Sequence, residues 1–274
     1  MSLIEPVSSR FVGDARFQRL LVDAGGDIAR AQELFEWNVR ASGAAMEAIL
    51  VFELVLRNAI DRELRIWNDG MAGTPDWLLH PHPYLLRAMN QIELSKAATR
   101  ARRIAGDHDR PVSHDDVLAQ MSLGVWRYLL PSKANKSKQK LWTVAINNAF
   151  PAWPGEWSAD SIVARVANVH GLRNRVAHLE PLHRFDLRKV RRDMRSVCHA
   201  IGPDAARFFV QTERLLAVIE ANPATEGGGV PWGGVVLGAG CHVVDVVSHR
   251  AMVSENRLKL LTERHDARWL LTSL

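Results

Sequence analysis

The sequence predicts an all-α fold, a helical bundle followed by a glycine-rich linker and a small C-terminal appendage. Three observations support this prediction. Apolar residues recur at steps of three and four through most of the first 222 residues. Prolines and glycines gather in short segments between these runs, as at 70–83 and 151–155. After Asn222 the composition changes, because residues 223–240 hold seven glycines and two prolines and have no helical period.

The individual helices follow from this pattern in chain order. Residues 27–69 contain no proline, and the pair Ser42-Gly43 predicts a break that divides them into two helices. Ser113 followed by Asp116 is a capping pair that begins a helix with a break near Gly124. The other predicted helical segments are 84–105, 138–150, 158–178, 185–200 and 203–222. We therefore expect one helical domain over 1–222, and a linker with a poorly ordered tail over 223–274.

Composition restricts the class of protein. The chain has 274 residues, of which 47% are hydrophobic and 24% charged, and this excludes a disordered chain, a collagen-like repeat and a disulfide scaffold. Two cysteines, Cys198 and Cys241, predict a reducing, cytoplasmic location. The apolar stretch 230–247 is interrupted by His242 and Asp245, so we expect neither a membrane span nor a membrane partner. The N-terminus predicts no signal peptide.

No motif indicates a cofactor or a metal. The run of glycines at 227–229 lacks the flanking strand and helix of a phosphate-binding loop, and no cysteines and histidines have the spacing of a zinc site. The sequence therefore predicts no cofactor and no metal.

The segment 170–183, HGLRNRVAHLEPLH, carries the strongest chemical signal. On a helix Asn174 stacks beside His178, and the long side chain of Arg173 reaches the same surface. Cleavage of RNA by its own 2′-hydroxyl needs a histidine that transfers a proton and an arginine that binds the phosphate. An amide can fix either group. Arg173, Asn174 and His178 are therefore candidate site residues.

The spacing alone has another interpretation. A second Arg-x4-His match occurs at Arg103 and His108, in a Gly-Asp-rich loop without an adjacent asparagine, and we regard it as accidental. The alternative to catalysis is that Asn174 and His178 only form hydrogen bonds to buried backbone groups or cap the helix.

Three stretches in order give the chain a family resemblance. They are ELVLRNAID at 53–61, MSLGVWRYLL at 121–130 and HGLRNRVAH at 170–178. Together they resemble the Abi-like (abortive infection) proteins of the HEPN ribonuclease superfamily, over roughly residues 10–222 of the chain.

The resemblance implies a HEPN-like helical bundle that forms a homodimer. The Arg-x4-His motifs of two protomers would meet in one cleft and form a metal-independent endoribonuclease site, with Arg173 and His178 catalytic and Asn174 supporting. Such enzymes act as toxins or phage-defence effectors, and an antitoxin or other regulatory protein is a possible partner. Two positions depart from the pattern of this superfamily. Leu179 stands where many members have a polar residue, and Glu180 stands where another HEPN branch has a tyrosine that a partner antitoxin modifies.

Arg57 and Asn58 are further supporting candidates. We hypothesise that their helix lies against the Arg173 helix, so that one of them lines the same cleft. An intrahelical ion pair between Glu53 and Arg57 is the alternative explanation.

A basic helix follows the motif directly. It carries the candidate RNA-binding residues Arg184, Arg188, Lys189, Arg191 and Arg192. These cations can follow RNA phosphates, or they can form an ordinary solvated face. The sequence thus predicts an endoribonuclease, with a catalytically inactive helical RNA- or protein-binding module as the alternative.

Overall fold

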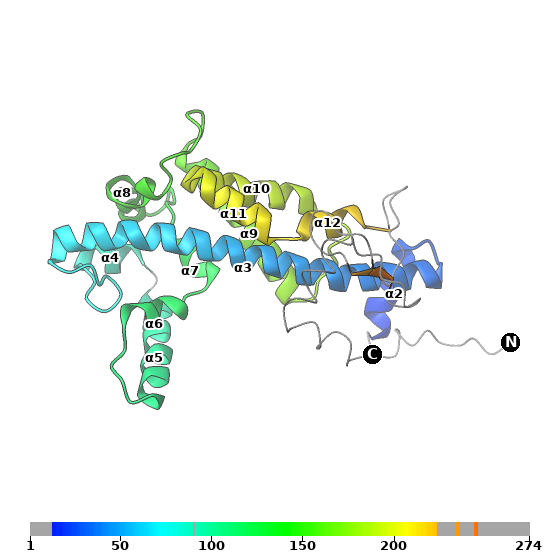
Figure 1. Cartoon of the computed structure of the whole chain (residues 1–274), viewed down its shortest axis with the longest axis horizontal. Coiled ribbons are helices and arrows are strands. Elements are labelled where there is room, and N and C mark those ends of the chain that lie inside the picture. The colour runs from blue at the N-terminus through cyan, green and yellow to red at the C-terminus, as the bar shows by residue number, and fades with distance from the viewer. Residues whose placement is uncertain (1–12, 90, 224–233, 236–243, 246–274) are drawn as a thin grey trace, which may run out of the picture. The chain divides into compact units, whose positions relative to one another are not determined.

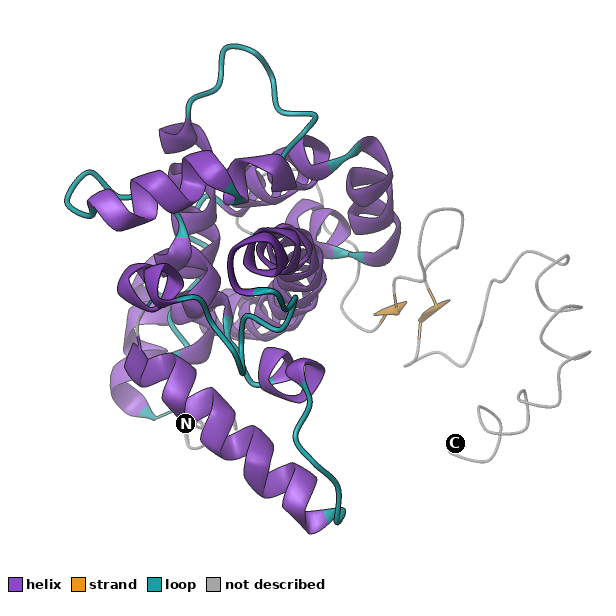
Figure 2. Cartoon of the chain, turned by 90° about the vertical axis from the view of Figure 1, so that its left-hand side faces the viewer, coloured by secondary structure: helices purple, strands orange, loops and turns teal. Residues whose placement is uncertain are grey.

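The computed structural model describes residues 13–89, 91–223, 234–235 and 244–245. These residues are mostly helical, which confirms the all-α prediction (Figure 2). The α-helices are α2 (Asp14–Asp23), α3 (Ile28–Ala72), α4 (Pro83–Ala88), α5 (Gln91–Asp107), α6 (His114–Ala119), α7 (Leu123–Leu129), α8 (Lys136–Val144), α9 (Ala159–Ala177), α10 (Leu187–Ile201), α11 (Pro203–Thr212) and α12 (Leu215–Glu220), and η1 (Ile146–Ala149) is a 3-10 helix. The two-residue strands β1 (Gly234–Val235) and β2 (Val244–Asp245) pair antiparallel. None of the described helices is long and apolar enough to cross a membrane.

The chain divides into two compact units, one formed by residues 41–216 and one by segments 1–40 and 217–274. The division crosses α3 between Arg40 and Ala41. The predicted boundary after Asn222 stays a prediction, and most of the predicted linker and tail lies outside the described residues.

The predicted break at Ser42-Gly43 is wrong, because α3 continues through both residues as one helix (Figure 1). An isolated glycine costs a helix only about 1 kcal/mol relative to alanine. Gly43 itself is exposed, but Ala41, Ala44 and Ala48 on either side of it in the sequence are buried on the packed face of the helix. Burial of this face outweighs the local penalty.

Three other predicted boundaries also differ. The segment 84–105 is two helices, because Met89 takes an extended conformation that ends α4. The break in 113–130 falls at 120–122 instead of Gly124, and Ser113 begins α6 with the predicted capping box. The segment 203–222 divides at Glu213, whose carboxylate accepts a hydrogen bond from the Leu215 N–H at 2.6 Å and so caps α12.

Each unit has its own apolar core. In the unit of residues 41–216, α9 and α11 both pack on α10, and α7 packs on α9 (Figure 1). Its largest fully buried side chains include Phe52, Trp77, Trp126, Phe150 and Phe209. In the other unit, Phe17, Leu20 and Ala24 of α2 and its C-terminal turn pack on Ala31 and Leu34 of α3.

A buried amide on α3 holds the loop that follows this helix. The Asn68 side chain donates to the carbonyl oxygens of Thr74 at 2.8 Å and His80 at 3.1 Å, and it accepts from the His82 N–H at 2.9 Å. Asn68 is fully buried. Because all its main hydrogen-bonding groups are used, the residue fixes the path of the loop.

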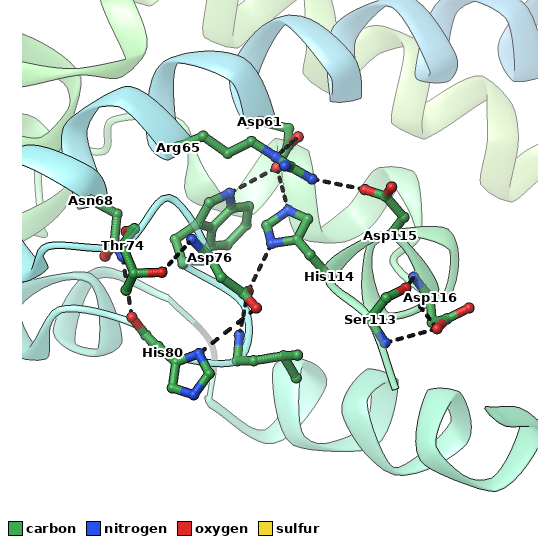
Figure 3. Close-up of polar contacts among 12 residues, drawn as sticks. Asp61, Arg65, Asn68, Thr74, Asp76, His80, Ser113, His114, Asp115 and Asp116 are labelled. Carbon is green, nitrogen blue, oxygen red and sulfur yellow. Dashed lines mark hydrogen bonds and ion pairs between the residues drawn. The ribbon is translucent and has the colours of Figure 1, made fainter. Parts of the chain in front are cut away.

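His114 links α6 to the same region through two carboxylates (Figure 3). Its Nε2 lies 2.8 Å from Asp61 Oδ1, and its Nδ1 lies 2.9 Å from Asp76 Oδ1. Asp61 also accepts from Trp77 Nε1 at 2.8 Å and from Arg65 Nε at 2.9 Å. Two carboxylates on the two ring nitrogens favour the imidazolium form.

The pKa values of these groups move in opposite directions. Burial opposes the charge on His114, but hydrogen bonds to Asp61 and Asp76 outweigh it and raise the pKa above 6.5. Burial also opposes the charge on both carboxyls, yet the hydrogen bonds that they accept lower their pKa below 3.8. The contribution of His114 to stability is therefore complete below pH 6.5 and is lost as the pH rises through its raised pKa. The contribution of the carboxyls is present above pH 3.8 and is lost as the pH falls through their lowered pKa.

We predict that His114→Gln lowers the free energy of unfolding by about 3 kcal/mol near pH 5.5, because it removes the one cation that is hydrogen-bonded to both Asp61 and Asp76. The gap to the wild type should shrink near pH 8.5. Urea unfolding followed by circular dichroism measures both values. His108→Gln, at an exposed histidine, is the control. A gap that stays constant across this pH range would show that His114 is held as a neutral ring.

Candidate functional site

The candidate residues lie at the C-terminal end of α9. Ser158 begins this helix, and Ile162, Val166, Val169, Leu172 and Val176 form its buried stripe. Arg173 and Asn174 lie outside this stripe, so their side chains are not used for core packing.

His178 is the C-cap residue of α9. The helix closes there with two backbone hydrogen bonds, from the Leu179 N–H to the Val176 carbonyl at 3.1 Å and from the Glu180 N–H to the Arg175 carbonyl at 2.9 Å. This is the Schellman pattern, in which the residue after the C-cap takes a left-handed conformation. Here that residue is Leu179, with φ 55°. The backbone of His178 is thereby fixed at a defined helix end.

Arg173 and His178 are both exposed. Arg173 Nη1 donates a long hydrogen bond to Asn174 Oδ1 at 3.4 Å. In the described part of the chain, no carboxylate pairs with Arg173, and the His178 imidazole has no hydrogen-bond partner. Five residues correspond to about 140° around a helix axis, so the two side chains diverge at their Cα atoms. The Arg173 side chain therefore contacts Asn174, whereas His178 lies about one helical turn further along the chain and contacts neither side chain.

Arg127 and His170 are site residues that the sequence analysis missed. Arg127 Nη1 on α7 donates to His170 Nδ1 at 2.7 Å, and the Asn174 amide nitrogen lies 3.5 Å from the same atom. An Nδ1 that accepts carries no proton, so the neutral ring is protonated at Nε2. Burial, followed by the charges of Arg127 and Arg173, lowers the pKa of His170. His170 is therefore a neutral acceptor at neutral pH.

A chain of side chains thus connects α7 with the motif. Arg127 binds His170, the Asn174 amide lies beside His170, and the Asn174 oxygen accepts from Arg173. A sequence signal existed, because His170 precedes Asn174 by one helical turn and both it and Arg127 fall in stretches that define the resemblance.

Glu53 of α3 lies at the same place. Burial raises its pKa, against the lowering effects of Arg57, of a hydrogen bond from the Leu123 backbone and of the Arg173 charge. Glu53 therefore lies within range of the Arg173 charge, and the hypothesis that Arg57 or Asn58 lines the same cleft stays a prediction. Arg57 is half-buried and Asn58 is exposed, and no side-chain hydrogen bond holds Asn58 in the described residues.

The basic surface lies on α10 and the turn before it. Arg184, Arg188, Lys189 and Arg192 are exposed, and Lys189 pairs with Asp193 at 3.0 Å. The expectation for Arg191 needs correction. Its guanidinium is 14% exposed and lies 2.6 Å from Glu213, whose carboxylate is 1% exposed. Arg191 therefore stabilises the junction of α10 with the start of α12 and is not available to RNA.

His114 and Cys198, which could also be reactive, are not accessible to a substrate. Both ring nitrogens of His114 are bonded to carboxylates, and its side chain is 8% exposed, so this histidine has no atom free for a substrate. Cys198 is buried, and burial raises the pKa of its thiol to about 12. Cys241 lies outside the described residues. No group of three or more His, Cys, Asp or Glu side chains in the described ranges is placed to hold a metal ion.

Comparison of the chain with protein-family models, with curated proteins and with solved structures finds no match.

Proposed function

We propose that this chain is an endoribonuclease of a phage-defence or toxin system, which cleaves RNA without a metal. The observation that carries the proposal is the state of Arg173 and His178. Both are exposed at the same end of α9, and in the described part of the chain neither is neutralised by a carboxylate. Because core packing and helix capping use other groups, the guanidinium and the imidazole are available to a substrate.

The reaction is attack of a ribose 2′-hydroxyl on the adjacent phosphorus atom. An imidazole removes the hydroxyl proton, the 2′-oxygen bonds to phosphorus, and the bond from phosphorus to the 5′-oxygen breaks. A proton returns to the leaving 5′-oxygen. The products are a 2′,3′-cyclic phosphate and a 5′-hydroxyl. Arg173 stabilises the negative charge that develops on the phosphate.

A homodimer would provide two imidazoles for these two proton transfers. One chain contributes a single Arg173 and a single His178, and a second copy contributes the other set across a two-fold axis. One His178 then acts as base and the other as acid.

The alternative is a catalytically inactive helical module that binds RNA or a protein partner. The observation that favours it is the exposed basic set on and before α10, which needs no chemistry to attract a polyanion. Leu179, where relatives have a polar residue, is consistent with it.

We predict that His178→Ala reduces the rate of RNA cleavage by about 100-fold or more, because the proton-transfer group is lost. The assay incubates the full chain with total RNA in a chelator and identifies the ends of the products. His108→Ala, the histidine of the accidental motif, should cleave like the wild type. Equal cleavage by His178→Ala and the wild type would contradict the assignment, and binding without cleavage by the wild type would support the inactive module.

A second prediction concerns the basic surface of α10. The double variant Arg188→Gln/Arg192→Gln should bind single-stranded RNA more weakly, with a salt dependence smaller by about 0.7 in log–log slope for each lost phosphate contact. Anisotropy titrations from 50 to 300 mM salt would measure it. Arg207→Gln, on the exposed surface of α11 and paired with Asp204, is the control. An unchanged slope would mean that α10 is an ordinary solvated face.

A further inference from the structure

We propose that Arg57, Arg127 and Arg173, from three different helices, form one anion site that binds a phosphate group of the RNA chain. We further propose that His170 is the positioning residue that holds Arg127 in this site. The inference rests on the proposed function, which it extends by two residues, Arg127 and His170.

The first observation is a difference among the half-buried arginines. A guanidinium out of water needs a compensating charge, and most arginines of this class in the described residues have one. Arg65, Arg165, Arg175 and Arg191 each have a carboxylate oxygen within 4.0 Å. Arg57 and Arg127 are also half-buried, and no carboxylate oxygen of the described residues lies within 4.0 Å of either guanidinium.

The groups around Arg57 and Arg127 do not remove this deficit. The Nε of Arg57 is buried and has no hydrogen-bond partner. Within the described part of the chain, the groups that contact Arg127 are neutral: the His170 ring at 2.7 Å and the Tyr128 ring, whose centroid lies 4.9 Å from the guanidinium carbon. Two half-buried arginines without a carboxylate at ion-pair distance are costly in a fold, and such a cost is typical of a ligand site.

The second observation links the three arginines through Glu53 and His170. Glu53 feels the charges of Arg57 and Arg173, and it binds the backbone of Leu123, one turn before Arg127 on α7. Arg127 then reaches α9 through His170, and Asn174 leads from His170 back to Arg173. These interactions connect α3, α7 and α9 in a ring, in which Glu53 is linked to Arg57 and Arg173 by charge and not by a hydrogen bond.

The charge balance of this ring is positive. Three guanidiniums meet a single carboxylate, Glu53, whose pKa is raised because burial outweighs the neighbouring cations. A phosphodiester supplies the missing negative charge and accepts hydrogen bonds from several guanidiniums at once. It is also the group that the proposed reaction brings to Arg173.

His170 has a defined role in this arrangement. As a neutral ring it accepts from Arg127 without competing for the anion. Gly124 of α7 lies directly beside the ring, because a Cβ at this position would be in van der Waals contact with His170 Nε2 at 3.4 Å. The helix α7 thus carries Arg127 and packs against the ring that binds it.

The test measures binding separately from cleavage. The probe is a fluorescein-labelled single-stranded oligonucleotide of 2′-O-methyl RNA, which cannot be cleaved because its 2′-oxygens are blocked. With the full chain, Arg57→Gln and Arg127→Gln should each weaken binding about tenfold or more, as expected for a lost charged hydrogen bond. Arg102→Gln, an exposed arginine on α5, makes the same change in net charge and should bind like the wild type.

His170 is tested by rescue. His170→Ala removes the acceptor and should weaken probe binding several-fold, whereas His170→Gln keeps an oxygen that accepts from Arg127 and should restore most of the affinity. Thermal unfolding of each variant shows whether it is folded. If Arg127→Gln does not fold, probe binding by Arg57→Gln, His170→Ala and His170→Gln tests the anion site. Equal weakening by both His170 variants would contradict the positioning role.

The two proposals fail in different ways. Cleavage of natural RNA by the wild type, together with wild-type probe affinity in Arg57→Gln and Arg127→Gln, would overturn the anion site and leave the nuclease intact. Absence of cleavage by the wild type, together with weakened probe binding in both variants, would overturn the nuclease and support the anion site.

Discussion

The fold of residues 41–216 depends on a row of polar side chains along α3, next to its buried stripe. The row has a spacing of four, four, four and three residues and consists of Glu53, Arg57, Asp61, Arg65 and Asn68. Residues at this spacing share one side of a helix. Glu53 binds the start of α7, Asp61 binds His114 of α6, and Asn68 binds the loop 74–82. One side of one helix therefore sets the positions of several neighbouring segments.

The two polar clusters on this row differ in charge balance. At His114, an imidazolium and an arginine meet the carboxylates of Asp61, Asp76 and Asp115, so every charge has a partner within hydrogen-bond distance. In the other cluster, Arg127 binds the neutral His170 ring, and Arg57 Nε has no hydrogen-bond partner among the described residues. A cluster of the first kind stabilises the fold, whereas a cluster of the second kind costs stability until an anion binds.

The helices could be predicted from the sequence wherever apolar periodicity and a capping signal agree, as at Ser113 and Ser158. The spacing of apolar residues does not show whether a helix continues through a single glycine, and so the break at Gly43 was predicted wrongly. The division at Glu213 depends on a carboxylate that also binds Arg191, 22 residues away in the sequence.

The exposed end of the candidate site was predictable, because Arg173, Asn174 and His178 share one helical segment. Its inner part was not. Arg127 and His170 are 43 residues apart, and only the packing of α7 on α9 brings the guanidinium to the ring. Likewise, nothing in the basic pattern of α10 separates Arg191, which is paired with a buried carboxylate, from its exposed neighbours.

The left-handed turn at Leu179 has a consequence for how the chain tolerates change. Leucine is 60% exposed there and adopts a conformation that glycine would adopt with about 1 kcal/mol less strain. The ion pair between Arg175 and Glu180, at 3.2 Å, spans the same turn and supports it. The turn that holds His178 is therefore rigid and slightly strained. A substitution at Leu179 that relieves the backbone strain would also change the conformation that fixes the position of His178.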